Sequence, residues 1–420
     1  MAKRSFTRLW LVLLATIVIT GCTKMAQGAE IRSDKPRAIS DATSQETLEL
    51  VAGNTAFASD LYQLLRQKSD GNLFFSPHSI SLALAMTYAG ARGETEQQMA
   101  VAMRYGLPQA RLHPAINALD ATLSEQDDAE SFELHIANAI WGQQGYQFLP
   151  AFLDTLAENY GAGIREVDFV SATEAARKTI NDWISDQTKD RIRDLIPQGA
   201  LDNLTRLVLT NAIYFNGKWA LPFDRIDTYD GPFTLPDGST VTVPLMTQTA
   251  GFRYAAGDNY QAIQLPYRDS SMSMLLILPE IDDFATVEAG FSPALLDEIA
   301  GNLAREQVHL VLPKYTFQSE INLSQALMEL GMPVAFSESA DFSGMTGNRE
   351  LSISEVLHKA FVKVDEEGTE AAAATGVVMR LTSLNPSVIQ MRLDHPFLFM
   401  IQDNHSGTVL FLGRVLNPAP

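Results

Sequence analysis

Residues 366–376 read Glu-Glu-Gly-Thr-Glu-Ala-Ala-Ala-Ala-Thr-Gly, and they carry the strongest signal in the chain. Gly368 gives the backbone freedom, and the alanines are small enough for close packing inside a sheet. If residues 369–380 are extended, their side chains alternate between two faces. One face then carries only uncharged residues, namely Thr369, Ala371, Ala373, Thr375, Val377 and Met379. Both charges, Glu370 and Arg380, fall on the other face, so the segment can enter a sheet without burying a charge.

A second interpretation of the same residues is a short alanine-rich helix. Alanine is the best helix former and a mediocre strand former, so local propensity favours the helix. These residues alone leave both interpretations open.

Composition excludes several classes of protein. The 420 residues are 46% hydrophobic, which allows a sizeable core, and the net charge of −19 makes nucleic acid an improbable partner. There is no phosphate-binding loop, nucleophile elbow or zinc-protease motif. The seven histidines are scattered singly, which is typical of structural or solvent-exposed positions. We therefore expect no enzyme activity, no metal and no cofactor.

The first 21 residues form a predicted export signal of bacterial type. Three basic residues precede an apolar run over residues 9–19. Eleven residues are too few for a stable membrane anchor. The signal should therefore be cleaved.

The end of this signal, Ile19-Thr20-Gly21-Cys22, resembles a lipobox, in which the cysteine is lipidated after cleavage. An ordinary secretion signal is the alternative. Cys22 is the only cysteine, so no disulfide forms within one molecule. Residues 22–46 are polar and are expected to be a lipid attachment site and flexible tether. The protein would then be a membrane-anchored lipoprotein or a secreted, extracellular protein.

Hydrophobic periodicity predicts an α+β fold with several helices and large β-sheets in a single domain over residues 47–420. Helices are expected at 47–66 and 79–88, and the second half is richer in strands. Strands are predicted at residues 132–140, 207–215, 272–278 and 308–317, with a hairpin of residues 398–401 and 409–415 around the turn 403–407.

The chain resembles the serpin family of protease inhibitors. HKAFVKVD at residues 358–365, followed by the alanine run, is similar to the hinge of an inhibitory serpin. Further blocks resemble the family in the same order: NLFFSPHSI at 72–80 with residues 83–86 and 90–95, residues 180–183 with Thr188, LTNAIYFNGKW at 209–219 with Pro222-Phe223, and DHPFLF at 394–399 with residues 413–415.

The resemblance implies a suicide mechanism and a serpin-like fold with an exposed reactive loop over about residues 366–388. A serine, or a cysteine, protease attacks this loop and forms an acyl-enzyme. The cleaved arm then inserts into the main sheet and distorts the protease, so the acyl bond is not hydrolysed. The residues implied as the hinge and the first part to insert are Glu366, Gly368, Thr369, Ala371, Ala372, Ala373 and Ala374.

Four more residues match family positions near the opening of the main sheet. Ser76, Ser79 and Asn211 match positions where the sheet opens, and Trp219 matches the tryptophan at its top. Ordinary core and cap hydrogen bonding is the alternative role for all four.

The family's usual spacing from the hinge glutamate places the reactive bond between Thr382 and Ser383, which suits an elastase-like protease. The loop is slightly longer than is common in the family, so Leu381, for a chymotrypsin-like enzyme, and Arg380, for a trypsin-like enzyme, remain alternatives.

Two other functions remain to be weighed. One is a noninhibitory serpin that acts as a surface binding protein, and the other is a hydrolase whose triad assembles from distant residues. Noninhibitory members tend to carry bulky, charged or proline residues in the hinge, and this hinge has none after Glu370. We therefore favour an inhibitor, whose partner is a target protease. We also expect a monomer that is attached to a membrane through a lipid on Cys22.

Overall fold

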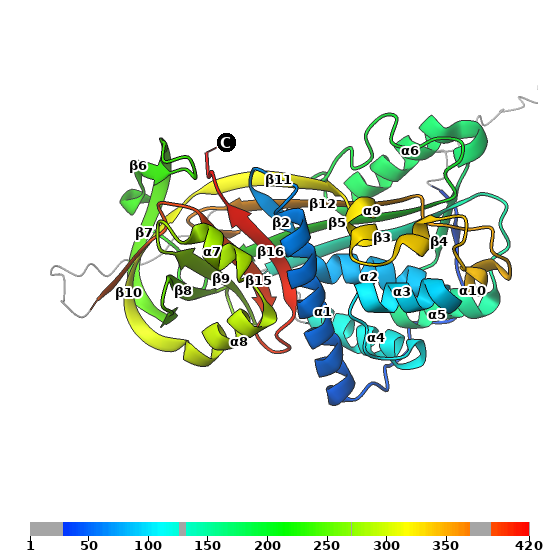
Figure 1. The fold of residues 1–420 in the computed structure, drawn as a ribbon, viewed down its shortest axis with the longest axis horizontal. Coiled ribbons are helices and arrows are strands. Elements are labelled where there is room, and N and C mark those ends of the chain that lie inside the picture. Colours follow the sequence, from blue (N-terminus) through cyan, green and yellow to red (C-terminus); the bar gives the residue numbers. More distant parts are fainter. Residues whose placement is uncertain (1–27, 126–131, 270, 370–387, 420) are drawn as a thin grey trace, which may run out of the picture.

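In the computed structural model the described residues are 28–125, 132–269, 271–369 and 388–419. They form two large β-sheets with helices packed around them (Figure 1). This arrangement confirms the predicted α+β class.

Sheet A contains the predicted hinge. Its strands, in spatial order, are β1 (Glu30–Ile31), β4 (Ile164–Val167), β3 (Phe132–Gln143), β5 (Leu207–Lys218), β13 (Gly368–Thr369), β12 (Glu355–Val364) and β11 (Tyr315–Asn322). β5 and β12 also pair directly with each other in parallel, whereas β13 is antiparallel to both. Sheet A is therefore a mixed sheet with a very short central strand.

Sheet B packs against sheet A. Its strands, in order, are β14 (Ile389–Arg392), β10 (Ala304–Pro313), β7 (Thr240–Ala256), β8 (Tyr260–Pro266), β9 (Met272–Pro279), β15 (Phe397–Asp403), β16 (Val409–Val415) and β2 (Leu73–Phe75), with β6 (Tyr229–Thr234) paired to β7. β15 and β16 form the predicted hairpin around residues 403–407.

Helices cover both sheets. They are α1 (Ser44–Leu65), α2 (Pro77–Tyr88), α3 (Gly93–Ala102), α4 (Gln109–Glu125), α5 (Pro150–Tyr160), α6 (Phe169–Gln187), α7 (Phe284–Ala289), α8 (Pro293–Asn302), α9 (Ser324–Glu329) and α10 (Ser343–Thr346), with short 3₁₀ turns η1 (Arg225–Asp227) and η2 (Pro333–Phe336). Within the described ranges no helix is both long and apolar enough to cross a membrane.

The alternation of β5 divides the interior into two cores. Leu209 and Ile213 belong to the main core, which sheet A shares with sheet B, α1 and α2. Val208 and Ala212 belong to a second core under α6. Odd-numbered residues of β5 therefore face the main core, and Asn211 is one of them.

Local signals explain where the helices begin. Ser76 caps α2, because its Oγ accepts a hydrogen bond from the Ser79 N–H at 3.1 Å, and Pro77 occupies the first turn. At α1, Thr43 and Glu46 form a reciprocal capping box.

One predicted strand is wrong in its extent. Residues 308–317 belong to two strands of different sheets, because β10 ends at Pro313 and β11 begins at Tyr315. Pro313 has no N–H to continue a ladder, and the N–H of Lys314 donates to the Pro244 carbonyl at 2.9 Å. The chain leaves sheet B at this point.

The N-terminal segment, residues 28–43, lies against the body. β1 pairs antiparallel with the edge strand β4, with Glu30 opposite Arg165. Arg37 donates to Asn117 Oδ1 at 2.7 Å and forms an ion pair with Asp120 at 2.6 Å. The segment therefore extends sheet A by one strand and then crosses α4.

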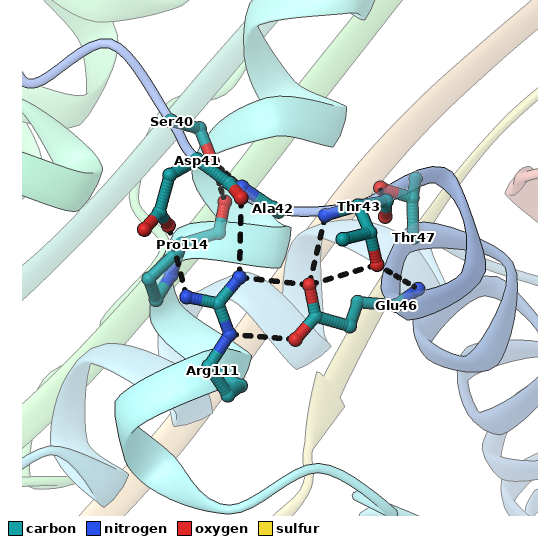
Figure 2. A network of polar contacts seen from close by, with 8 residues as sticks. All are labelled: Ser40, Asp41, Ala42, Thr43, Glu46, Thr47, Arg111 and Pro114. Atoms are coloured by element: carbon teal, nitrogen blue, oxygen red, sulfur yellow. Dashed lines mark hydrogen bonds and ion pairs between the residues drawn. The ribbon is translucent and has the colours of Figure 1, made fainter.

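Figure 2 shows where this segment joins α1. Arg111 of α4 binds Asp41 Oδ1 at 3.0 Å and Glu46 Oε1 at 2.6 Å. The hydrogen bond from Arg111, with that from the Thr43 backbone, lowers the pKa of Glu46 to about 2. Glu46 thus stays ionised and holds the start of α1 to α4.

These contacts correct the predicted tether. The sequence predicts a flexible tether over residues 22–46, but residues 28–43 are docked and α1 begins at Ser44. The polar residues that suggest a tether are used in ion pairs with α4 and α5, such as Lys35 with Asp154 at 3.1 Å. Residues 22–27, with Cys22, lie outside the described residues.

Candidate functional site

Two residues of the predicted hinge, Gly368 and Thr369, already lie in sheet A. β13 sits between the ends of β5 and β12, with Gly368 opposite Lys218 and Thr369 opposite Gly217. On its other side, Thr369 pairs with Val364. The chain therefore enters the sheet at the hinge.

Close packing explains the glycine at position 368. A Cβ on this residue would lie 2.0 Å from the carbonyl oxygen of Gly217 and 2.8 Å from the Cα of Lys218. Backbone atoms of a sheet interior cannot move away cheaply, so any larger residue displaces β13.

Thr369 is fixed through its side chain as well as its backbone. It is 1% exposed, and its Oγ1 lies 2.7 Å from the hydroxyl of Tyr267. Burial raises the pKa of Tyr267, so its phenol stays protonated, and either hydroxyl can donate in this hydrogen bond. The Tyr267 ring in turn stacks on Trp219, with centroids 4.7 Å apart.

Trp219 directly follows the last residue of β5, and it holds the turn before β13. Its indole Nε1 donates to the Asp365 carbonyl at 3.0 Å, and its backbone N–H donates to the Glu367 carbonyl at 2.9 Å. The N–H of Phe223 donates to the remaining carbonyl, that of Glu366, at 2.8 Å. Three consecutive hinge carbonyls are thus satisfied by one short segment.

The Glu366 side chain is buried and paired. Its carboxylate accepts from Lys314 Nζ at 2.8 Å and from the Thr228 hydroxyl at 2.9 Å. Burial alone would raise the pKa of Glu366, but these donors lower it below its ordinary value. The neighbouring Glu367 forms an ion pair with Arg225. Charges at the hinge are therefore neutralised locally.

Below the hinge, the seam between β5 and β12 is closed. The two strands pair directly in parallel from Val208 opposite Glu355 to Tyr214 opposite Phe361. If the residues after Thr369 continued β13 in the same antiparallel register, they would lie between β5 and β12. They could enter this position only after the direct pairing of β5 with β12 was broken.

A buried polar cluster lies on the seam. Asn211 of β5 is hydrogen-bonded to His358 of β12, to Asn138 of β3 and to the Ser79 Oγ of α2. The backbone N–H of Ser76 donates to His358 Nε2 at 3.2 Å. We call these residues the seam cluster. It joins both sides of the seam to the helix behind them.

His358 is neutral in this cluster. Burial lowers its pKa to about 3, and the N–H of Ser76 needs an unprotonated Nε2 as its acceptor. A protonated imidazole would carry a hydrogen on Nε2, so two buried donors, this N–H and the N–H of Ser76, would face each other.

The structure brings together three of the four residues predicted at the sheet opening. Ser76, Ser79 and Asn211 meet in the seam cluster, whereas Trp219 lies near the hinge, about 26 Å from Asn211 along β5 at 3.3–3.4 Å per residue. Their roles in sheet opening stay a prediction.

Sequence reasoning missed His358, Asn138, Lys314 and Tyr267. His358 was readable in principle, because it is the polar member of an apolar alternation with Val356 and Ala360 on the main-core face of β12. The other three lie far from the hinge in the sequence, and no motif around them predicts that they contact the hinge or the seam.

Several predicted site residues lie outside the described part of the chain. They are Ala371, Ala372, Ala373, Ala374, Arg380, Leu381, Thr382, Ser383 and Cys22. Among the described residues, no group of histidine, cysteine or acidic side chains could hold a metal ion.

Comparisons with known proteins agree on one family. The sequence model described as Serpin (serine protease inhibitor) matches residues 52–418. Leukocyte elastase inhibitor A of Mus musculus is 40% identical over 381 residues, covering 88% of this chain and 100% of the relative.

Two solved structures show the same fold. Uncleaved ovalbumin is 28% identical with a TM-score of 0.80, covering 88% of this chain and 100% of its own. The thermophilic serpin tengpin in its native state is 27% identical with a TM-score of 0.83, covering 93% and 100%. The chain therefore belongs to the serpin family.

Proposed function

We propose that this protein is a suicide inhibitor of serine proteases. The observation that carries the proposal is β13: Gly368 and Thr369 already form the first pairs of a strand between β5 and β12. The family membership and the relatives named leukocyte elastase inhibitor support protease inhibition, with an elastase-like enzyme as the partner.

The chemistry follows from acyl transfer. The protease serine Oγ attacks the carbonyl carbon of Thr382, the amide bond to Ser383 breaks, and its nitrogen leaves as a new amino terminus. An ester then joins the protease to the arm that ends at Thr382. If the arm zips into the seam below Thr369, the protease is dragged along sheet A and its oxyanion hole is distorted. Water then cannot complete the hydrolysis.

The hinge suits this movement. The inserting face carries Ala371 and Ala373, which need little space, and both charges of the segment stay on the other face. Thr369 contacts Tyr267 of the main core, so a strand that continued from Thr369 would turn Ala371 and Ala373 toward the same core.

The test is to mix the protein with leukocyte elastase and look for a complex that survives denaturing electrophoresis. Mass spectrometry of the released loop fragment identifies the bond, with cleavage after Thr382 expected. Quantitative loop cleavage without any covalent complex would instead support a noninhibitory serpin that acts as a binding protein.

We also propose that the protein is exported and held at a membrane by a lipid on Cys22. The placement of Cys22 directly after the apolar run and Gly21 supports this. Fractionation of bacterial cells should find the wild type in the membrane fraction and the Cys22→Ala variant in the soluble fraction. Equal membrane retention of the two forms would exclude Cys22 as the anchor.

A further inference from the structure

The segment that joins β5 to β6, residues 219–228, and the first residue of β6 expose three large apolar side chains. Leu221 is 44% exposed, Ile226 is 73% exposed and Tyr229 is 44% exposed. Single exposed apolar residues are ordinary on protein surfaces, but three within nine positions of one segment offer more apolar surface to a partner than a single residue does. We call these three residues the apolar patch.

The segment that carries the apolar patch is hydrogen-bonded to the chain near both ends of the predicted reactive loop. On the hinge side, the N–H of Phe223 holds the Glu366 carbonyl at 2.8 Å. On the other side, Arg392 of β14 donates to the Tyr229 hydroxyl at 2.7 Å. Residues 370–387 leave and rejoin the described structure between these two attachments. A protein that grips the loop therefore approaches the surface that carries the patch.

Charge around the apolar patch is acidic. Asp227 and Asp230 are exposed beside it, while the nearby Arg225 is engaged by Glu367. A partner with an apolar surface bordered by basic side chains would fit this arrangement, and the net charge of −19 would attract it from a distance.

We propose that Leu221, Ile226 and Tyr229 form a docking surface for the protease that attacks the reactive loop. This inference rests on the proposed function and deepens it. The loop sequence determines which bond is cut, and the apolar patch selects among proteases with the same cleavage preference by contacting their surface outside the active site. Such contacts raise the rate of association and leave the fate of the acyl-enzyme unchanged.

The test compares the Leu221→Ser/Ile226→Ser double variant with the wild type. Leu221 and Ile226 are 44% and 73% exposed and belong to neither hydrophobic core, so the double variant should keep the fold. The matched control is Leu204→Ser, because Leu204 is 72% exposed and lies just before β5, at the opposite end of that strand from Leu221. The measurement is the second-order rate of loop attack by leukocyte elastase, with covalent complex and cleaved product counted together.

Loss of two anchoring apolar contacts should slow loop attack by about tenfold, and the control should stay within about twofold of the wild type. The ratio of complex to cleaved product should not change. Equal rates for the double variant and the wild type would overturn the proposal.

Two further measurements distinguish protease docking from a changed loop and from self-association. Thermolysin, a protease of unrelated fold, should cut the loop of both forms at the same rate, and a slower cut in the variant would mean that the loop itself has changed, which overturns docking. The second measurement is sedimentation. If the wild type is a dimer, the double variant is a monomer and the two react with elastase at equal rates, the apolar patch binds a second copy of the chain, and the docking proposal is overturned. A wild type that is only cleaved would contradict inhibition, yet the comparison of attack rates would still decide the docking proposal.

Discussion

The hydroxyl groups of Thr369 and Tyr267 lie 2.7 Å apart inside the protein, and this contact ties the start of the predicted reactive loop to the main core. Tyr267 is itself stacked on Trp219, which holds the Asp365 and Glu367 carbonyls. The hinge is therefore built as the fixed end of a strand, from which further residues can add to the sheet.

Replacing Thr369 with arginine should convert the protein from an inhibitor into a substrate. The site is buried beside Tyr267, and an unpaired charge there would expel β13 and stall insertion. Titration against elastase should show that many more inhibitor molecules are cleaved per protease trapped. Thr369→Ser, which keeps the hydroxyl, is the control and should behave like the wild type. An unchanged stoichiometry in the arginine variant would contradict insertion at this position.

Gly368→Ala should have a similar but weaker effect. The added methyl group would lie 2.0 Å from the Gly217 carbonyl oxygen, so β13 must shift or leave the sheet. We expect more cleavage and less trapping, and faster proteolysis at the hinge. Gly301→Ala is a matched control, because a Cβ there meets nothing within 4 Å. If both alanine variants match the wild type, the tight approach at Gly368 has no role in trapping.

Stability should fall as the pH drops from about 6.5 to about 3, because of His358. Its pKa is lowered to about 3 by burial, against an ordinary value of 6.5. Between these values the histidine is protonated in the unfolded chain but neutral in the folded protein. Its contribution to the free energy of unfolding is therefore fully present above pH 6.5 and is lost on acidification. The full effect is on the order of 5 kcal/mol.

The measurement for this prediction is urea unfolding at several pH values for the wild type and His358→Gln. The variant should show a shallower loss of stability with acid. His113, whose pKa burial lowers to about 4, contributes in the same direction, so a second variant, His113→Gln, separates the two residues. A pH dependence that His358→Gln leaves unchanged would show that the seam cluster does not exclude the proton.

Sequence patterns predicted the elements with strong periodicity and missed those that depend on distant partners. The hairpin of β15 and β16 and the helix after Pro77 follow from local signals. The alternative of an alanine-rich helix from Thr369 onward is settled only for Thr369, which pairs as a strand with Gly217 and Val364. The alanines that follow lie outside the described residues.

The N-terminal segment shows the limit most clearly. Its polar composition predicts a tether, but Lys35, Arg37 and Asp41 find partners on α4 and α5. Ion pairs between segments far apart in the sequence leave no period or motif, so composition alone cannot distinguish a docked segment from a free one.

In the proposed mechanism, the free energy for trapping comes from rearranging the seam between β5 and β12. Insertion of the arm would break the parallel ladder of seven residue pairs that joins β5 to β12. It would form two antiparallel ladders, one on each side of the arm. The inserted arm would therefore gain one ladder of backbone hydrogen bonds more than the closed seam has, and it would bury Val377 and Met379.

The most direct test of the insertion mechanism is therefore a pair of melting curves. One sample is the intact protein, and the other is nicked between Val378 and Leu384 by a protease that it does not trap. A cut normally loosens a protein, but insertion of the freed arm predicts a nicked form that melts at a clearly higher temperature than the intact form. A nicked form that melts at the same temperature or lower would contradict insertion and favour a noninhibitory serpin.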